Sequence, residues 1–195
     1  MKNEEILAHF RETDALLKGH FLLSSGLHSD HYLQAAKVLM YPDRAAALAA
    51  ALAARVREKF GEDAVDVVVG PAMGGIIIAY ELARQLAVPG IFTERENGVF
   101  TFRRGFSLAP GARVIMSEDI VTTGKSSREC IDAIRAAGGE VIGATCLIDR
   151  SNGTADVGVP LVSLMKMEVR TFPADQVPPE LADVPVVKPG SRNIK

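Results

Sequence analysis

Apolar residues recur every three or four positions along four stretches of the chain, a spacing typical of one buried face of an α-helix. The predicted helices cover residues 3–18, 43–60, 75–87 and 126–137. The second helix follows Pro42 and has Asp43 as its N-cap, and the fourth is followed by Gly138 and Gly139. Residues of these types are common start and stop signals, so they mark the ends of these two helices.

Short runs rich in β-branched residues lie between and after these helices. The predicted strands cover residues 65–69, 90–93, 113–116, 141–148 and 161–165. Continuous apolar strands that alternate with helices predict a parallel sheet with helices on both faces, which is an α/β fold. Because ligands of such sheets bind beyond the carboxyl ends of the strands, we expect functional residues in the loops that follow the strands.

Two segments depart from this alternation. In residues 94–108, Asn97 and Gly98 stand between apolar runs, and this pair predicts a hairpin that projects from the sheet. The tail after Thr171 is rich in proline, and its pattern predicts no element. No repeat or low-complexity linker divides the 195 residues, so we expect a single domain.

Composition narrows the range of functions. The chain has 22 Lys and Arg against 24 Asp and Glu, and a net charge of −2 gives no reason to expect a nucleic acid or an anionic membrane as partner. Its 2 cysteines exclude a disulfide framework and a four-cysteine zinc site. The acidic N-terminus does not resemble a signal peptide, and the Ala- and Leu-rich residues 45–54 are too few to span a bilayer. We therefore expect a cytoplasmic protein.

Residues 114–127 carry the strongest chemical signal. An apolar strand leads to the adjacent carboxylates of Glu118 and Asp119, and a hydroxyl- and glycine-rich turn then opens a helix. The turn and the helix N-terminus offer backbone N–H groups to a phosphate, and Gly124 lets the backbone approach it closely. Hydroxyls that can add hydrogen bonds are those of Thr122, Thr123 and Ser126. The alternative is an ordinary helix start after a buried strand, which the full order of residue types disfavours.

This strand, acidic pair and Thr-Thr-Gly-Lys-Ser loop resemble the hallmark of the type I phosphoribosyltransferase family, whose members bind 5-phosphoribosyl 1-pyrophosphate (PRPP). A nucleotide-binding P-loop needs glycine five positions before Gly124, where this chain has Asp119, so a nucleoside triphosphatase is disfavoured. The resemblance implies that Glu118 and Asp119 hold the ribose hydroxyls and that residues 122–126, the phosphate loop, hold the 5-phosphate. It also implies a central parallel sheet flanked by helices, with an N-terminal hood and a projecting flexible hairpin loop.

Two further segments would contact the pyrophosphate by the same resemblance. A glycine-rich turn after the first parallel strand matches the family's pyrophosphate-binding loop and would place Ala72, Met73 and Gly74 against the leaving group. Arg95, in the projecting segment, matches an arginine of a mobile loop that closes over PRPP and often reaches the neighbouring subunit's site. Without the resemblance, these features would indicate a packing turn and a solvated hairpin.

Two segments resemble the base-binding parts of the orotate-specific members of the family. Residues 19–32 contain the Ser-Gly-x-x-Ser-x-x-Tyr pattern of their hood, which implies that Ser25 and Tyr32 contact orotate. Arg150 ends a predicted strand where those members have a base-binding arginine, and its paired N–H donors suit the carboxylate of orotate. Thr122 would contribute from the phosphate loop. Without the resemblance, Arg150 would be interpreted as a structural ion-pair partner.

The resemblance extends from about residue 19 to residue 150 and implies an enzyme that transfers the 5-phosphoribosyl group of PRPP to orotate, forming orotidine 5-phosphate and pyrophosphate. The catalytic residues would be Glu118, Asp119 and Arg95. The PRPP-binding residues would be Ala72, Met73, Gly74, Arg95, Glu118, Asp119, Ile120, Val121, Thr122, Thr123, Gly124, Lys125 and Ser126. Mg²⁺, bound mainly through the substrate, would be the cofactor, and the protein would form a homodimer. The domain would have a core of about residues 41–170, and a hood of about residues 1–40 with the C-terminal tail.

Two alternatives share the PRPP site. One is a phosphoribosyltransferase for a purine or another base, and the other is a PRPP-sensing regulator without catalysis. The hood pattern and Arg150 favour orotate over a neutral purine. The near-neutral charge and single-domain length disfavour a regulator with a nucleic-acid surface.

Overall fold

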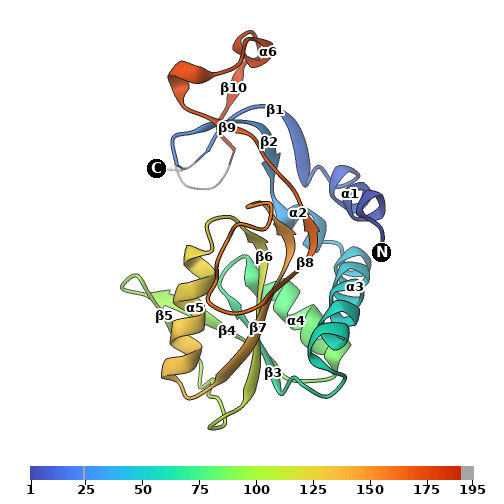
Figure 1. The fold of residues 1–195 in the computed structure, drawn as a ribbon, viewed down its shortest axis with the longest axis vertical. Helices are drawn as coiled ribbons and strands as arrows, with labels where there is room; N and C mark the ends of the chain where they lie inside the picture. Colours follow the sequence, from blue (N-terminus) through green and yellow to red (C-terminus); the bar gives the residue numbers. More distant parts are fainter. Residues whose placement is uncertain (24, 190–195) are drawn as a thin grey trace.

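The structure is a computed structural model that describes residues 1–23 and 25–189. Its strands form two sheets, a larger one in the body of the molecule and a smaller one at one end of the long axis (Figure 1). The body lies below the smaller sheet in this view, and the chain passes between them three times, near residues 14, 34 and 168.

The larger sheet contains all five predicted strands and the second strand of the predicted hairpin. They are β3 (Val67–Pro71), β4 (Gly90–Glu96), β5 (Val99–Phe102), β6 (Arg113–Val121), β7 (Glu140–Asp149) and β8 (Leu161–Lys166). The order across the sheet is β5-β4-β3-β6-β7-β8, and neighbours are parallel except for the β4–β5 pair. The parallel sheet predicted from the apolar runs is therefore confirmed.

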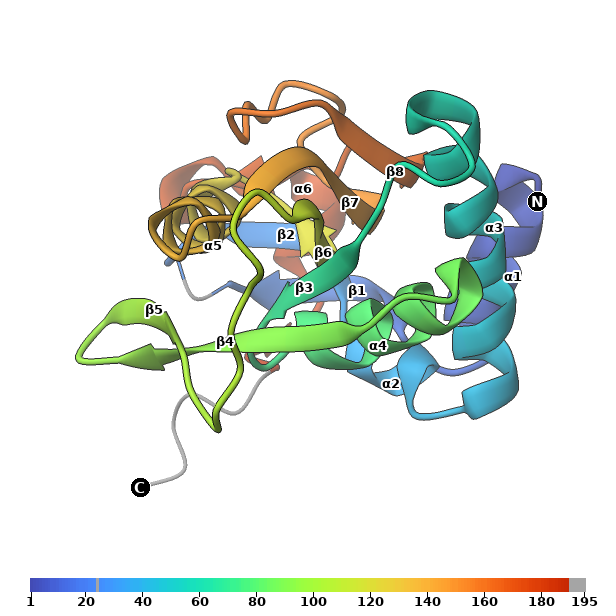
Figure 2. The ribbon, with the colours of Figure 1, turned by 90° about the horizontal axis from the view of Figure 1, so that it is seen from below.

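Helices cover both faces of this sheet, as predicted. They are α3 (Pro42–Phe60), α4 (Gly75–Leu86) and α5 (Lys125–Ala136). Successive strand residues point to opposite faces, so Ile115 packs in one hydrophobic cluster with Leu48 and Leu82, while Val114 packs in another with Ile131. Helices α3 and α4 thus share one face of the sheet, and α5 occupies the other (Figure 2).

The predicted hairpin is formed by β4 and β5. Asn97 and Gly98 connect the two strands with positive φ angles of 51° and 86°, as the tight two-residue turn of a hairpin requires. Phe100 is buried in the hydrophobic cluster on the α5 face of the sheet, whereas Val99 is exposed. The base of the hairpin is therefore packed against the body, and its turn points into solvent.

The smaller sheet is built from both ends of the chain. Its strands are β1 (Leu16–Leu22), β2 (His28–Leu33), β9 (Thr171–Phe172) and β10 (Val186–Val187), in the order β10-β1-β2-β9. Short helices accompany them: α1 (Asn3–Arg11), α2 (Ala35–Leu39), the 3-10 helix Ala174–Gln176 and α6 (Pro179–Ala182). The tail, for which the sequence predicted no element, thus adds the two edge strands of this sheet.

The first predicted helix, residues 3–18, is wrong beyond Arg11. The Thr13 hydroxyl donates a 2.9 Å hydrogen bond to the carbonyl of His9, and Asp14 adopts a positive φ of 52°. That conformation turns the chain out of the helix. Leu16 then begins β1, whose pairing with β2 and β10, both outside the predicted helix, outweighs the helical spacing of its apolar residues.

The two N-terminal helices α1 and α2 pack on the body of the molecule. Ile6 and Phe10 of α1 and Val38 and Leu39 of α2 belong to the hydrophobic cluster that α3 and α4 share. They therefore attach the strands of the smaller sheet, which lie between them in sequence, to the larger sheet. None of the helices in the described part of the chain is both long and apolar enough to cross a membrane.

Candidate active site

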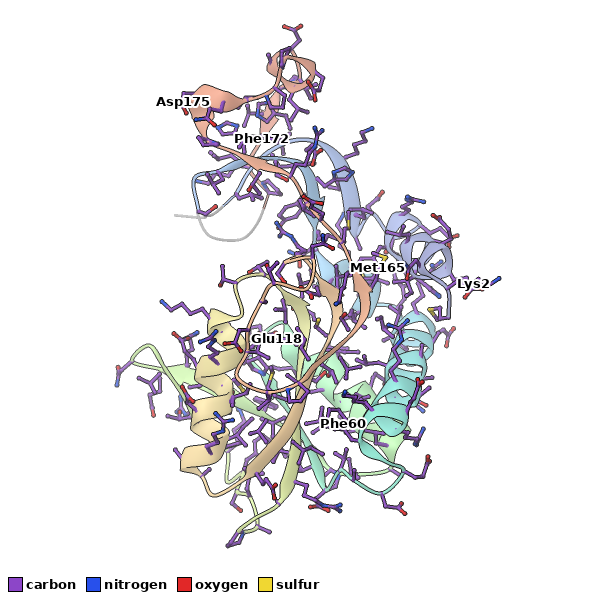
Figure 3. The ribbon with its side chains drawn as sticks, viewed as in Figure 1. Lys2, Phe60, Glu118, Met165, Phe172 and Asp175 are labelled. Atoms are coloured by element: carbon purple, nitrogen blue, oxygen red, sulfur yellow. The ribbon has the colours of Figure 1, made fainter. Side chains whose placement is uncertain are left out.

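The acidic pair lies in the second half of β6, a strand in the centre of the larger sheet. Glu118 is 8% exposed and Asp119 is partly buried. Because adjacent strand residues point to opposite faces, the Glu118 side chain lies on the α5 face (Figure 3) and that of Asp119 on the α4 face. The structure therefore brings the predicted pair together at one height of the sheet but turns the two carboxylates apart.

The Asp119 carboxylate lies against the turn between β3 and α4. A Cβ atom added to Gly74 would stand 2.9 Å from both carboxylate oxygens, so only glycine allows this approach. The Asp119 Oδ1 atom also accepts a 2.7 Å hydrogen bond from the backbone N–H of Ile120. The predicted pyrophosphate loop and the predicted ribose-binding carboxylate are thus direct neighbours.

Burial opposes the negative charge of both carboxylates. It raises the pKa of Glu118 to about 8, and the neighbouring charge of Asp119 adds to the shift. Burial likewise raises the pKa of Asp119, although the N–H of Ile120 offsets part of this effect. Two carboxylates with raised pKa values favour a partner that brings positive charge or hydroxyl donors to them.

The phosphate loop connects β6 to α5 and leaves a helix N-terminus open. Gly124 stands at the N-cap with a φ of 75° and no side chain caps the helix, so the first N–H groups of α5 can donate to an anion. The side chains of Thr122, Thr123, Lys125 and Ser126 are exposed around this opening. Val121 and Gly124 are buried, and Ile120 is partly buried, so these three contribute backbone rather than side-chain contacts.

The turn between β3 and α4 presents Ala72, Met73 and Gly74 at the carboxyl end of the sheet. Ala72 is tied to the neighbouring strand, since its N–H donates a 2.8 Å hydrogen bond to the carbonyl of Thr93. Met73 is 82% exposed and makes the turn accessible from outside. This loop, Asp119 and the phosphate loop border the same end of β3 and β6.

Arg95, at the end of β4, lies against the start of α5 in its own chain. Its guanidinium is 4.0 Å above the Phe100 ring, donates a hydrogen bond to the Glu129 carboxylate and reaches the Ser126 hydroxyl at 3.4 Å. The Nη1 atom donates a 2.7 Å hydrogen bond to the carbonyl of Gly98. The structure therefore joins Arg95 to the phosphate loop through Ser126.

The other two arginines of the hairpin region pair within it. Arg104 donates hydrogen bonds of 2.7 and 3.0 Å to the two oxygens of Glu94, and Arg103 lies 3.7 Å from a Glu96 oxygen. The hydrogen bonds from Arg104 lower the pKa of Glu94. These pairs leave Arg95 as the hairpin arginine that contacts the phosphate loop in the described structure.

Two of the predicted base-binding residues, Tyr32 of the smaller sheet and Arg150 after β7, lie near each other. The N–H of Arg150 donates a 2.8 Å hydrogen bond to the carbonyl of Val121, and burial lowers the pKa of its guanidinium, while nearby Tyr32 acts in the opposite direction. Its Nε is buried without a hydrogen-bond partner among the described residues. Ser25 lies at the surface of the turn before β2, where its hydroxyl accepts a 3.4 Å hydrogen bond from Leu27.

Glu129 is a site residue that the sequence reasoning missed. It lies three residues after Ser126 on α5, so both side chains share one face of the helix. That spacing was readable from the sequence, but the partnership with Arg95 depends on the position of the hairpin over α5. Among the described residues, no group of three or more His, Cys, Asp or Glu side chains is arranged to hold a metal ion.

The fold and these loops define the class of the protein. A strand-borne acidic pair, an open helix N-terminus and a glycine turn meet at the carboxyl end of a parallel sheet. The family model for the phosphoribosyl transferase domain matches residues 39–182. The chain therefore belongs to the phosphoribosyltransferase family.

Relatives that match the full length of the chain indicate which member of this family it resembles. The orotate phosphoribosyltransferase of Caulobacter vibrioides is 56% identical, and that of Phenylobacterium zucineum 55%, each over 195 residues that cover 100% of both chains. A solved orotate phosphoribosyltransferase from Aeropyrum pernix has a TM-score of 0.63 and 28% identity, covering 81% of this chain and 91% of that one. Within the family, these similarities place the chain among the orotate phosphoribosyltransferases.

Proposed function

We propose that the protein transfers the 5-phosphoribosyl group of PRPP to orotate, giving orotidine 5-phosphate and pyrophosphate. The observation that carries the choice of base is Arg150, a partly buried arginine whose Nε has no hydrogen-bond partner in the part of the chain that the structure describes. A buried guanidinium donor without an acceptor is unfavourable, and the carboxylate or ring carbonyl of orotate would satisfy it. The full-length similarity to orotate phosphoribosyltransferases supports the same choice over a purine or a regulatory role.

In this proposal PRPP lies along the carboxyl ends of β3 and β6. The phosphate loop holds the 5-phosphate, and Glu118 and Asp119 hold the ribose hydroxyls. Ala72, Met73 and Gly74 face the pyrophosphate. The nearness of Gly74 to Asp119 supports this order, since ribose and pyrophosphate are adjacent in PRPP.

The reaction breaks the bond between the anomeric carbon and the pyrophosphate oxygen while a bond to the orotate nitrogen forms, and the proton of that nitrogen passes to the pyrophosphate or to water. Orotate already carries a nucleophilic nitrogen, so no strong side-chain base is needed. Catalysis then rests on positioning and on stabilising the charge of the leaving pyrophosphate. Arg95 supplies positive charge beside Ser126, and the loop N–H groups supply donors.

We also propose Mg²⁺ as the cofactor. The carboxylates of Glu118 and Asp119 fit a hard cation, because they are oxygen ligands whose negative charge is opposed by burial. The two side chains lie on opposite faces of β6, so a single ion would contact at most one of them, and most of its coordination would come from substrate oxygens and water. When bound, Mg²⁺ supplies positive charge that neutralises the pyrophosphate as it leaves.

A homodimer and a cytoplasmic location complete the proposal. Ile77 and Tyr80 lie on one face of α4 and are 42% and 63% exposed. Neighbouring exposed apolar side chains of this size are typical of an interaction surface, and a second copy of the chain would cover them. Light scattering should give a dimer mass for the parent and a monomer mass for Tyr80→Asp, and a monomeric parent would contradict the dimer.

The proposed cytoplasmic location agrees with the cysteines. The free thiols of Cys130 and Cys146 are buried, as suits a reducing compartment.

The decisive test mixes the purified protein with PRPP, Mg²⁺ and orotate and follows the loss of orotate absorbance. Parallel reactions offer adenine, guanine, hypoxanthine and uracil. We expect magnesium-dependent loss with orotate alone. Turnover of another base would replace the substrate assignment, and PRPP binding without any turnover would support a regulator instead.

A further inference from the structure

The segment that follows Arg150 turns back and packs behind the phosphate loop. A Cβ atom added to Gly124 would lie 3.0 Å from Cγ1 of Val157, 3.2 Å from the carbonyl oxygen of Asp156 and 3.7 Å from Cβ of Ala155. Val157 is 1% exposed and belongs to the hydrophobic cluster on the α5 face. Residues 155–157, here called the supporting segment, therefore form the wall against which the loop lies.

An arginine of α5 fastens the supporting segment to the helix that begins at the loop. Arg128 Nε donates a hydrogen bond of 2.5 Å to the carbonyl of Asp156, and its Nη2 lies 2.9 Å from the Asp156 carboxylate. The other carboxylate oxygen of Asp156 accepts a 2.8 Å hydrogen bond from the N–H of Gly158. Arg128 lies one helical turn after Gly124, so the Arg128–Asp156 ion pair holds the supporting segment beside the phosphate loop.

The start of the segment is held by a buried carboxylate. Asp149 is 1% exposed and accepts hydrogen bonds of 2.9 and 2.5 Å from the N–H and hydroxyl of Ser151. The Ser151 hydroxyl in turn accepts a 2.8 Å hydrogen bond from the N–H of Ala155. The turn that begins at Arg150 and ends on the phosphate loop is therefore closed by side-chain hydrogen bonds.

Beside the supporting segment lies a pocket of about 220 Å³ that is open to solvent and is lined by Asp149, Gly153, Ala155, Val157 and Lys166, among others. The side of the segment that borders this pocket is not fixed by packing. Its position then depends on the Val157 contact, the Arg128–Asp156 pair and the closed turn.

We propose that Val157, Asp156 and Arg128 are positioning residues that hold the phosphate loop in the conformation that binds the phosphate end of PRPP. The inference rests on the proposed function of the loop. Gly124 keeps a positive φ at the N-cap of α5, where it lies against Val157 and the Asp156 carbonyl, and a loop ordered before binding loses less free energy when the ligand arrives. Loosening the segment should therefore weaken PRPP binding, while orotate binding to the PRPP-loaded protein changes little.

The test compares Val157→Ala and Arg128→Gln with the parent. The control is Arg135→Gln, since Arg135 also joins α5 to this stretch of chain, through a 3.4 Å hydrogen bond to the Gly158 carbonyl, but near the other end of the helix. Val157→Ile keeps the apolar contact and serves as the conservative variant. Far-UV circular dichroism and urea unfolding establish that each variant is folded before binding is compared.

Calorimetric titration with PRPP and Mg²⁺, without orotate, gives the dissociation constant directly, and steady-state rates give KM and kcat. We expect both test variants to raise the PRPP dissociation constant and KM about three- to tenfold. The orotate KM at saturating PRPP and kcat should change less than about twofold, as should every constant of Arg135→Gln and Val157→Ile.

Equal losses for PRPP and orotate, a loss confined to kcat, or an effect of Arg135→Gln as large as that of Arg128→Gln would overturn the proposal. The titration also separates this inference from the proposed function. If the parent binds PRPP but does not turn over orotate, the proposed function fails while the comparison of PRPP affinities still decides the role of the supporting segment.

Discussion

The two ends of the proposed substrate site are built in different ways. The PRPP end comes mainly from one continuous stretch, in which β6, the phosphate loop and α5 follow each other within residues 113–136. The base end joins Tyr32 of the smaller sheet to Arg150 at the end of β7. Local chain geometry therefore shapes one end, and tertiary packing shapes the other.

The base end also depends on the C-terminal tail. Asp30 is 7% exposed and accepts hydrogen bonds from His31 and from Arg170, which lies just before β9. Burial alone would raise the pKa of Asp30, but these two partners lower it below its usual value. Residues 140 positions apart are thus needed to place one wall of the base site. Substitutions at the PRPP end should therefore mainly lower the rate of the reaction. Substitutions at the base end should mainly weaken the binding of orotate.

The largest effect is expected at the PRPP end. Asp119→Asn keeps the shape of the side chain but removes the charge next to Gly74, so kcat/KM should fall by about a hundredfold or more. Steady-state kinetics measure the fall. Asp132→Asn, which alters an exposed carboxylate of α5, is the control and should behave as the parent. Activity of Asp119→Asn near that of the parent would remove Asp119 from the site.

A smaller and more selective effect is expected at the base end. Arg150→Gln removes the guanidinium but keeps the backbone hydrogen bond to Val121, so the orotate KM should rise about thirtyfold. The PRPP dissociation constant should stay within about twofold of the parent value. Arg113→Gln is the control, because Arg113 begins β6 and lies at the end of the larger sheet opposite to the site. An equal rise in both constants would mean that the two ends are not separable.

Arg95 tests whether the hairpin belongs with the PRPP end. Arg95→Ala should lower kcat about tenfold, because charge-assisted contacts are lost, with a smaller change in the orotate KM. Arg104→Ala is the matched control, since Arg104 lies in the same region but pairs with Glu94. Equal rates for Arg95→Ala and the parent under saturating substrates would exclude the proposed role.

The contrast between local chain geometry and tertiary packing also explains which elements could be predicted from the sequence. The central sheet, α3, α4, α5 and the Asn97–Gly98 turn follow local patterns that the fold preserves. The end of α1 was misplaced because Leu16 begins a strand that pairs with β2 and with the C-terminal β10, and the local spacing of apolar residues shows neither pairing. Tail strands β9 and β10 had no signal, since two-residue strands exist only through their pairing with β1 and β2.

Within the site, the same limit applies to individual residues. The phosphate loop and acidic pair stand in one motif, so the sequence alone was enough to select them. The contact between Glu129 and Arg95 and the packing of Val157 on Gly124 join residues about thirty positions apart. No fixed spacing in the sequence predicts either contact, because each contact depends on how the strands and helices pack together.

The last prediction compares two buried carboxylates, one at each end. Burial raises the pKa of Glu118 from 4.5 to about 8, so between these values the folded protein holds a proton that the unfolded chain has lost. The free energy of unfolding of the ligand-free protein should therefore fall as pH rises from 5 to 8, by up to about 1 kcal/mol per pH unit from this group. The pKa of Asp30 is lowered instead. Its stabilising effect is complete above the unfolded value and is lost only as pH falls through the lower folded value.

Urea unfolding at pH 5, 6, 7 and 8 measures the slope. Glu118→Gln, which cannot ionise, should flatten the slope relative to the parent. Asp30→Asn should lower stability by a similar amount at each pH and leave the slope unchanged, because Asp30 is ionised in both states over this range. A parent and a Glu118→Gln variant with the same slope would show that Glu118 is already charged in the folded protein at pH 5. The acidic pair would then carry its full negative charge without substrate, and the contrast between the two ends would rest on geometry alone.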